Sequence, residues 1–519
     1  MVMVSPNLCP SMQGRVHELQ TLILSFHPLI VFETVEEERV QVLLQAATQE
    51  MGRTLMEWSI TQGLTRSPVS VDNRWQNDCA PTSQPAAYDN SYEPLEVLKR
   101  IQELNLNAIF WLKDFSVHLE DATVARQFRE LVQTFSQSRS AIVLTGNSVI
   151  LPQEVNHEAV YYDLKLPARD ELHQAVMATV RSLRAKNRVQ IEIQDHEIQT
   201  LVHSLSGMTL QQARKVVAYA ALEDGKLTVQ DIDRVLHRKA QVIREESVLE
   251  YFPVDHAPLQ WGGFAGLKQW LNQAKVGFSP QAREWNLQPP KGILIVGIQG
   301  CGKSLAAKAI AKAWKMPLLK LDAGRLYDKY VGESEKNFRQ ALSLAESMAP
   351  AVLWIDEIEK SFGTSNSDSD GGLSQRMFGS FLTWMQEKSQ EVFVIATAND
   401  LSKIPPELLR KGRFDEIFFV DLPDAKERAT ILQLHLVQRK QDPAQFDFNA
   451  LVAATDGFSG AEIEQAIVAS LYKALHLNQP LGTDLIIESV KSTIPLSVSR
   501  REDVNRLRTI ARERFVSVR

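Results

Sequence analysis

The sequence predicts an α/β fold in which parallel sheets are flanked by helices. Three short apolar runs are typical of buried strands: ILIV at 293–296, AVLWI at 351–355 and VFVIA at 392–396. An alanine-rich segment follows the first run over 305–314, and its composition favours a helix. At 519 residues the chain is too long for one ordinary core, so about two to four domains are expected.

The composition is that of a globular protein, with 44% apolar and 23% charged residues. A formal net charge of −6 argues against binding of nucleic acid through a broad basic surface. The three cysteines, Cys9, Cys79 and Cys301, are far apart and odd in number, which argues against a disulfide framework or a zinc site. No run is apolar enough to span a bilayer and the N-terminus lacks a secretory pattern, so we expect a reducing, cytoplasmic location.

The segment GIQGCGKS at 297–304 matches the pattern GxxxxGK[ST]. A strand before it and a helix after it give the geometry in which backbone N–H groups and a helix N-terminus cradle phosphates. Lys303 is expected to reach the outer phosphates, and the Ser304 hydroxyl to ligate Mg²⁺. The alternative is a glycine-rich turn that binds nothing. The predicted nucleotide-binding residues of this segment are Gly297, Gly300, Cys301, Gly302, Lys303, Ser304 and Leu305.

Polar residues end the second and third apolar runs. Asp356 and Glu357 follow the second run, and phosphoryl transfer needs a carboxylate near Mg²⁺ and a group that orients or deprotonates the attacking water. We assign Asp356 to the metal, together with Ser304, and Glu357 to the water. Asn399 follows the third run and is expected to hydrogen-bond the water or the γ-phosphate. Ordinary strand ends and turns are the alternative for all three positions.

Six segments occur in an order that resembles the AAA ATPases: GIQGCGKS, YVGESEKNFRQAL, LWIDEIE, ATAND, LLRKGRFD and DGFSGAEIEQAI. The match runs from about 262 to 477, and the pattern of the whole chain is similar to AAA proteins of cyanobacteria and algal plastids. The resemblance implies an ATPase with ATP and Mg²⁺ as cofactors. It also implies a P-loop AAA domain with a large ATP-binding subdomain at 263–422 and a small helical lid at 423–499. For a plastid-encoded member it implies a location in the stroma.

Two arginines three positions apart, Arg410 and Arg413, have no acidic partner nearby in sequence, and a guanidinium keeps its charge. In AAA proteins the ATP site lies between subunits of a ring, and arginines in these positions reach the γ-phosphate of the neighbour. The resemblance therefore implies a homo-oligomer, with six as the family's usual number of subunits, and hydrolysis that requires assembly. Tethering of a local loop or an acidic surface is the alternative for both arginines.

Five further positions correspond to family residues that contact the nucleotide. His435 falls where members have a His beside the adenosine, although a lone helical His is otherwise ordinary packing. Gly460 and Ala461 fall where small residues let the lid backbone approach the adenine, and a simple helix start is the alternative. Gly262 and Gly263 match the segment whose backbone meets the base.

Tyr330, Val331 and Gly332 match the aromatic, aliphatic and glycine triplet that lines the central pore of ring-shaped AAA remodelers. An aromatic side chain there grips an extended polypeptide with little sequence preference, and the glycine lets the loop move. The resemblance thus implies an ATPase that remodels or unfolds a protein client. Packing of this triplet at the entry to the next helix is the structural alternative. The alternative function is a nucleotide-dependent assembly switch or scaffold that binds a regulatory partner or RNA without threading.

The first 240 residues echo the strand order and lid of the second half but not its chemistry. NAIFWLKDF parallels AVLWIDEIE, and SAIVLTGN parallels VFVIATAN. Residues 33–39 offer neither a glycine loop nor a Lys-Ser pair, and Lys113 stands where Asp356 would be. A degenerate AAA-like domain that lacks the phosphate loop is therefore predicted at 1–240, with an unrelated α/β domain as the alternative.

Three segments are predicted to lie outside the packed domains. The stretch 67–94, rich in Pro, Ser and Asn, is interpreted as a mobile insert, and 241–262 as a linker. The Arg-rich end, 500–519, is interpreted as a basic tail whose helix docks against a neighbouring subunit. Such helices also meet membranes or RNA, so nucleic acid is not an expected partner but stays an alternative for this tail. The apolar stripe of the tail consists of Val504, Leu507, Ile510 and Phe515.

Overall fold

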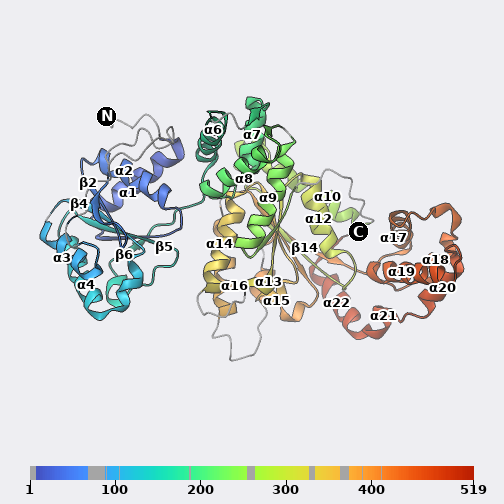
Figure 1. Cartoon of the computed structure of the whole chain (residues 1–519). Helices are drawn as coiled ribbons and strands as arrows, with labels where there is room; N and C mark the ends of the chain where they lie inside the picture. The colour runs from blue at the N-terminus through green and yellow to red at the C-terminus, as the bar shows by residue number, and fades with distance from the viewer. Residues whose placement is uncertain are drawn as a thin grey trace. The chain divides into compact units, whose positions relative to one another are not determined.

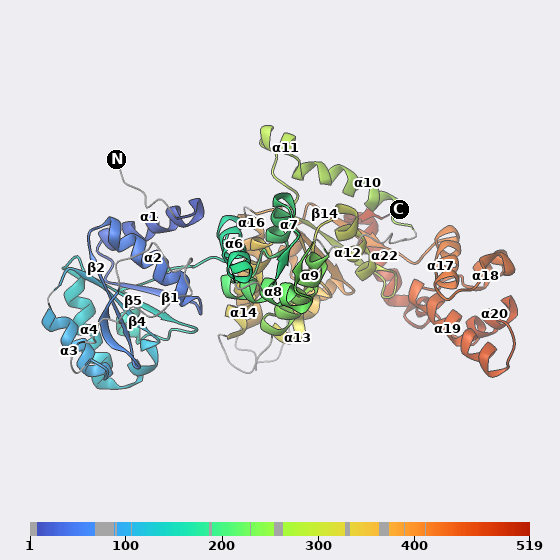
Figure 2. The same cartoon turned by 45° about the horizontal axis from the view of Figure 1, so that its top comes forward.

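The computed structural model describes residues 8–67, 88, 91–104, 106–185, 189–228, 230–253, 263–326, 333–362, 373–388, 390–410 and 412–518. The chain divides into two compact units, 1–236 and 237–519. Figures 1 and 2 show the helices and strands of both units, coloured along the chain from blue to red. Each unit contains a mainly parallel sheet with helices packed on it, so the α/β prediction is confirmed. Within the described ranges, no helix combines the length and the apolar character needed to cross a membrane.

The second unit contains a seven-stranded sheet in the order β15-β14-β10-β13-β12-β11-β9. All pairings are parallel except that of β9 with β11. β10, β12 and β13 are buried along their whole length, as expected for parallel strands covered on both faces. The strands are β9 (Leu249–Phe252), β10 (Gly292–Gly297), β11 (Leu318–Leu321), β12 (Ala351–Ile355), β13 (Val392–Ala398), β14 (Glu416–Val420) and β15 (Val516–Ser517).

Helices cover this sheet, and a separate helical group follows it in the chain (Figure 1). α10 and α12 pack on one face, where they share a core with Ile293, Trp354 and Phe393. α14 packs against β12 and against α16. The helical lid, α17 to α20, has a core of its own. The bounds are α9 (Asp231–Glu246), α10 (Ala265–Ala274), α12 (Lys303–Trp314), α14 (Glu333–Ser347), α15 (Ile358–Phe362), α16 (Leu373–Glu387), α17 (Ala425–Gln438), α18 (Phe448–Ala454), α19 (Gly460–His476) and α20 (Thr483–Lys491).

The first unit repeats the strand order of the second. Its sheet runs β3-β2-β4-β5-β1-β6, and only the pairing of β2 with β3 is antiparallel. Without β3, the order β2-β4-β5-β1-β6 corresponds strand for strand to β11-β12-β13-β10-β14. The echo found in the sequence is therefore a repeated topology. The strands are β1 (Leu29–Glu33), β2 (Thr54–Ser59), β3 (Gly63–Arg66), β4 (Ala108–Lys113), β5 (Ala141–Gly146) and β6 (Ala159–Tyr161).

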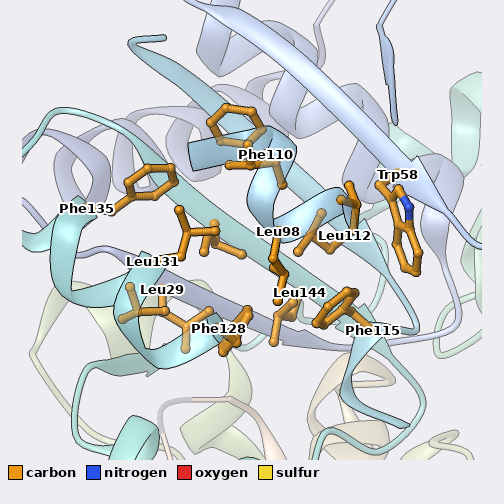
Figure 3. Packing of buried hydrophobic residues seen from close by; sticks show 14 of the residues in the cluster. Leu29, Trp58, Leu98, Phe110, Leu112, Phe115, Phe128, Leu131, Phe135 and Leu144 are labelled. Atoms are coloured by element: carbon orange, nitrogen blue, oxygen red, sulfur yellow. The ribbon is translucent and has the colours of Figure 1, made fainter. Parts of the chain in front are cut away.

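Apolar side chains fill both faces of the first sheet. On one face, Leu29, Phe110 and Leu144 come from three strands and pack with Leu98 and Phe128 of the covering helices (Figure 3). On the other face, alternate strand residues pack against α1 and α2. The helices are α1 (Pro10–Leu24), α2 (Glu37–Glu50), α3 (Pro94–Leu104), α4 (Ala122–Ser136), α6 (Arg169–Ala185), α7 (Asp195–Ser204) and α8 (Leu210–Glu223).

A buried ion-pair network follows β1 in the first unit, at the position where a glycine loop follows β10 in the second. Arg39 of α2 is only 2% exposed. Its guanidinium donates to both carboxylate oxygens of Glu171 in α6, at 2.7 and 3.0 Å. Glu36 accepts a hydrogen bond of 2.9 Å from the backbone N–H of Leu210, at the start of α8. The first unit thus joins its sheet to its later helices through its own side chains.

Two predicted segments differ from the structure. Residues 241–262 are not simply a linker, because α9 continues to Glu246 and β9 joins the edge of the second sheet. Residues 500–519 are not a tail docked on a neighbour, because α22 (Arg501–Arg514) and β15 pack within the second unit. Val504 lies in the core of that unit, and Arg508 pairs with Asp421 at 2.8 Å. The predicted insert 67–94 lies mostly outside the described residues.

We expect Val504→Asp to destabilise the second unit by about 3 kcal/mol, because the substitution buries a carboxylate that has no partner. Asn505→Asp is the matched control, since it introduces the same charge at the adjacent, exposed position of α22. Thermal unfolding of the two variants would measure the difference. Equal midpoints would mean that the C-terminal helix does not pack on the core.

Candidate active site

The loop between β10 and α12 has a backbone conformation that favours glycine at two positions. Gly300 and Gly302 have φ angles of +77° and +87°, and Gly302 caps the N-terminus of α12. Gly297 ends β10, where an added Cβ would lie 2.1 Å from the carbonyl oxygen of Val420 on β14. The sequence GIQGCGKS therefore forms a tight loop whose backbone N–H groups precede a helix N-terminus, which is suited to an anion.

Lys303 and Ser304 begin α12 and face the ends of the neighbouring strands. Lys303 is 7% exposed, and its ammonium donates to the carbonyl oxygens of Gly297 and Ile298 at 2.9 Å each. Burial lowers the pKa of Lys303 to about 8. The Ser304 hydroxyl donates to Asp356 Oδ1 at 3.1 Å. A buried cation and a hydroxyl-carboxylate pair therefore lie side by side at the start of one helix.

The two predicted acidic residues follow β12 directly. Glu357 has a φ of +50°, a left-handed conformation that is uncommon for a side chain of this kind. Its Oε1 accepts a hydrogen bond of 2.8 Å from Asn399 Nδ2, and its Oε2 pairs with the ammonium of Lys360. The structure thus brings Glu357 and Asn399 together, as expected if both act on the same water.

Two residues that the sequence did not single out connect this acidic group. The hydroxyl of Thr397 on β13 donates to Asp356 Oδ1 at 2.6 Å and accepts from the Glu357 backbone N–H at 3.0 Å. Glu359 accepts from the Asn399 backbone N–H at 2.9 Å, and burial raises the pKa of this carboxyl. Thr397 lies within the quoted segment ATAND, but no periodicity or spacing marks its contact with the next strand.

Asp356, Glu357, Thr397 and Asn399 line a cavity of about 570 Å³ together with the glycine loop, and residues of the lid form one side of it. This volume lies within the usual range for sites of small ligands and cofactors. The Ala461 N–H donates to the carbonyl oxygen of Gly300 at 3.0 Å, which joins the lid to the glycine loop. Leu305, His435, Gly460 and Ala461 all line the cavity, as predicted. Phe264 and Val518 also line it and were not predicted, Val518 because its segment was interpreted as a tail.

His435 is half-buried beside two charged residues of the lid. Its Nδ1 lies 3.2 Å from a guanidinium nitrogen of Arg439 and 3.7 Å from a carboxylate oxygen of Glu464. Burial lowers the pKa of His435, so the imidazole is mainly neutral at neutral pH. A neutral ring that lines the cavity fits contact with an uncharged base or ribose rather than with phosphate.

The remaining predicted residues do not line the cavity or fall outside the described part of the chain. Arg410 is exposed, and among the described residues its side chain has no hydrogen-bond or ion-pair partner. Arg413 donates to the Glu407 carbonyl oxygen at 2.7 Å, and neither arginine lines the cavity of its own chain. Gly263 has a φ of +76° and lies against the side chain of Glu427. Gly262 and the triplet Tyr330, Val331 and Gly332 fall outside the described residues.

The donor set of the cavity fits a nucleoside triphosphate with Mg²⁺. The glycine loop and Lys303 supply donors for phosphate oxygens. Ser304 and Asp356 place a hydroxyl and a carboxylate together, and oxygen groups of this kind are the ligands that Mg²⁺ prefers. The Cys301 thiol of the same loop is buried, and burial raises its pKa to about 12, so it is not a reactive thiolate near neutral pH.

Parts of the chain match known families. Residues 293–422 match the family described as ATPase family associated with various cellular activities (AAA). Residues 15–164 match the SpoVK-like AAA ATPase N-terminal domain, and residues 170–246 match the second domain of the same proteins. The first unit thus resembles domains found in AAA ATPases, in agreement with its repeated strand order.

Several curated proteins are similar to the chain. The uncharacterized AAA domain-containing protein ycf46 of Guillardia theta is 35% identical over 499 residues, which cover 95% of this chain and 94% of that protein. The protein of the same name from Pyropia yezoensis is 34% identical over 501 residues, which cover 95% and 97%. The ATPase family protein 2 homolog of Caenorhabditis elegans is 36% identical over 238 residues, or 43% of this chain and 33% of that protein.

Proposed function

Because the chain belongs to the AAA ATPase family, we propose that it is a ring ATPase that hydrolyses Mg-ATP to remodel or unfold a protein client. One observation carries the proposal: the ends of β10, β12 and β13 meet at the cavity. There they bring together a phosphate loop, a carboxylate pair and an amide, which are the groups that phosphoryl transfer requires.

Each of these groups has a role in the proposed reaction. Bound Mg²⁺ would offset the negative charge of the phosphates, held by Ser304 and Asp356. Lys303 would exchange its two carbonyl partners for phosphate oxygens. Glu357 would accept the proton of the attacking water or orient it, and Asn399 would fix the carboxylate through its amide N–H.

We further propose that the site is completed by a second copy of the chain in a homo-oligomer, a hexamer by analogy with the family. Phosphoryl transfer gains stabilisation from a guanidinium near the γ-phosphate. Neither Arg410 nor Arg413 lines the cavity of its own chain, and Arg410 is exposed. These placements support delivery of the arginines to a neighbouring copy. The first unit, which has side chains in place of a glycine loop, would serve as an adaptor or scaffold.

Glu357→Gln is expected to bind Mg-ATP and to lose hydrolysis at least about 100-fold, because the amide cannot take the proton from water. Light scattering should find this variant in a stable large assembly when ATP is present. Lys303→Ala is the matched control, since it should bind ATP poorly and stay in smaller species. A Glu357→Gln protein that hydrolyses ATP normally, or stays a single chain with ATP, would contradict the proposal.

Tyr330→Ala separates threading from the alternative, a nucleotide-dependent assembly switch or scaffold that binds a regulatory partner or RNA. If a polypeptide is gripped in a central pore, an unfolded protein such as casein should stimulate ATP hydrolysis by the unmodified chain. The stimulation should be lost in Tyr330→Ala, because the aromatic grip is removed. An equal response of both proteins would favour the switch.

A further inference from the structure

We propose that Thr397 and Glu359 are positioning residues that hold the hydrolytic side chains in register, an inference that rests on the proposed ATPase function. Each of the two residues reaches across to the neighbouring strand. Thr397 of β13 binds the two acidic residues that follow β12, and Glu359, which follows β12, binds Asn399 at the end of β13. We call this reciprocal pair of contacts the strand-end clasp.

The Thr397 half of the clasp uses both hydrogen-bonding capacities of one hydroxyl. Its oxygen accepts from the Glu357 backbone N–H at 3.0 Å, so its single proton is directed to Asp356 Oδ1 at 2.6 Å. Thr397 is 1% exposed, so water does not compete for these contacts. One hydroxyl therefore fixes the orientation of the Asp356 carboxylate, the proposed metal ligand, relative to the backbone N–H of Glu357, the proposed base.

The Glu359 half of the clasp fixes the third member of the set. Its Oε1 accepts the backbone N–H of Asn399 at 2.9 Å, and the residue is 7% exposed. Its Oε2 is buried and has no hydrogen-bond partner among the described residues. Buried polar groups are usually paired. The Glu359 carboxyl is buried although only one of its oxygens is hydrogen-bonded. This indicates that its contact with Asn399 offsets the unfavourable free energy of burying the carboxyl.

The first unit provides an internal comparison for Thr397. Thr145 of β5 lies opposite Lys113 of β4, at the position that corresponds to Thr397 opposite Asp356. With no carboxylate there, the Thr145 hydroxyl accepts a hydrogen bond of 2.9 Å from the indole N–H of Trp111. In the second unit, Trp354 corresponds to Trp111 and Thr397 to Thr145, but this indole donates no hydrogen bond to the threonine.

That indole belongs to Trp354, and its N–H is buried without a hydrogen-bond partner in the described part of the chain. The hydroxyl that could accept it is committed to Asp356 and Glu357. Leaving a buried donor unpaired destabilises the folded state. The second unit thus lacks the hydrogen bond between indole and threonine that the first unit has. This difference is expected if Thr397 positions Asp356 and Glu357 for hydrolysis.

The backbone conformation of Glu357 is a further observation that supports the clasp. Its φ of +50° is matched by the φ of +51° at Asp114, the corresponding residue of the first unit, so the turn belongs to the fold. A residue in this uncommon conformation is held by its surroundings. The bond from the Glu357 N–H to Thr397 is one such restraint, and its loss would let the carboxylate move relative to Asn399.

Paired substitutions test the clasp. Thr397→Val removes the hydroxyl and keeps the shape, whereas Thr397→Ser keeps the hydroxyl. Glu359→Met removes the acceptor, whereas Glu359→Gln keeps an oxygen that can accept the Asn399 N–H. We expect Thr397→Val and Glu359→Met to lower kcat about 10- to 100-fold with little change in ATP affinity, and the conservative partners to stay within about threefold of the unmodified protein.

Hydrogen exchange of the nucleotide-free protein supplies a second readout. The Glu357 amide should lose protection in Thr397→Val, and the Asn399 amide in Glu359→Met, while Ser and Gln should preserve both. If Thr397→Val or Glu359→Met does not fold, the proposal is tested with the two variants at the other position. A Thr397→Val or Glu359→Met protein with unchanged kcat would overturn the proposal, as would a Glu359→Gln protein as inactive as Glu357→Gln. If the unmodified chain hydrolyses no ATP while both amides are protected, the proposed function fails, and the positioning role fails with it.

Discussion

The chemistry of the site depends on the register in which β13 pairs with its parallel neighbours, β10 and β12. Ile355 lies opposite Ala396, so the next residues, Asp356 and Thr397, are adjacent at the strand ends. Val296 lies opposite Ala398, which places the glycine loop beside Asn399. Because side chains alternate between faces, a slip of one residue would turn these groups to the wrong side. The observed register thereby brings the site residues together, and the contacts of Thr397 and Glu359 then orient them.

The first unit has the same strand order as the second but lacks the residues of the candidate active site. It keeps the strand order, the buried strands and even the left-handed residue after β4, yet it has Lys113 where the second unit has Asp356. Buried contacts of Arg39 with Glu171 and of Glu36 with Leu210 connect the sheet to the later helices. The first unit therefore forms a sheet of this order without a glycine loop, and its own side chains take the place of that loop after β1.

Local patterns could be predicted from the sequence because their meaning lies within a few consecutive residues. The glycine loop, the acidic pair after β12 and the amide after β13 were found in this way, and the structure brings them together. The edge strands β9 and β15 were missed because four and two residues give no usable periodicity and their partners are distant in sequence. Thr397 and Glu359 were missed because their contacts cross between strands, which spacing along one chain does not reveal.

The central claim is that one chain holds the nucleotide and a second copy supplies the guanidinium. The most direct measurement mixes two defective chains: Glu357→Gln, which is expected to hold ATP and assemble but lacks the proposed base, and a variant with both Arg410 and Arg413 replaced by alanine. The account predicts that neither hydrolyses ATP alone and that the mixture recovers hydrolysis, because the first chain lends its arginines to the intact site of the second. An arginine-free chain that turns over ATP normally, or a mixed assembly that stays inactive, would contradict it.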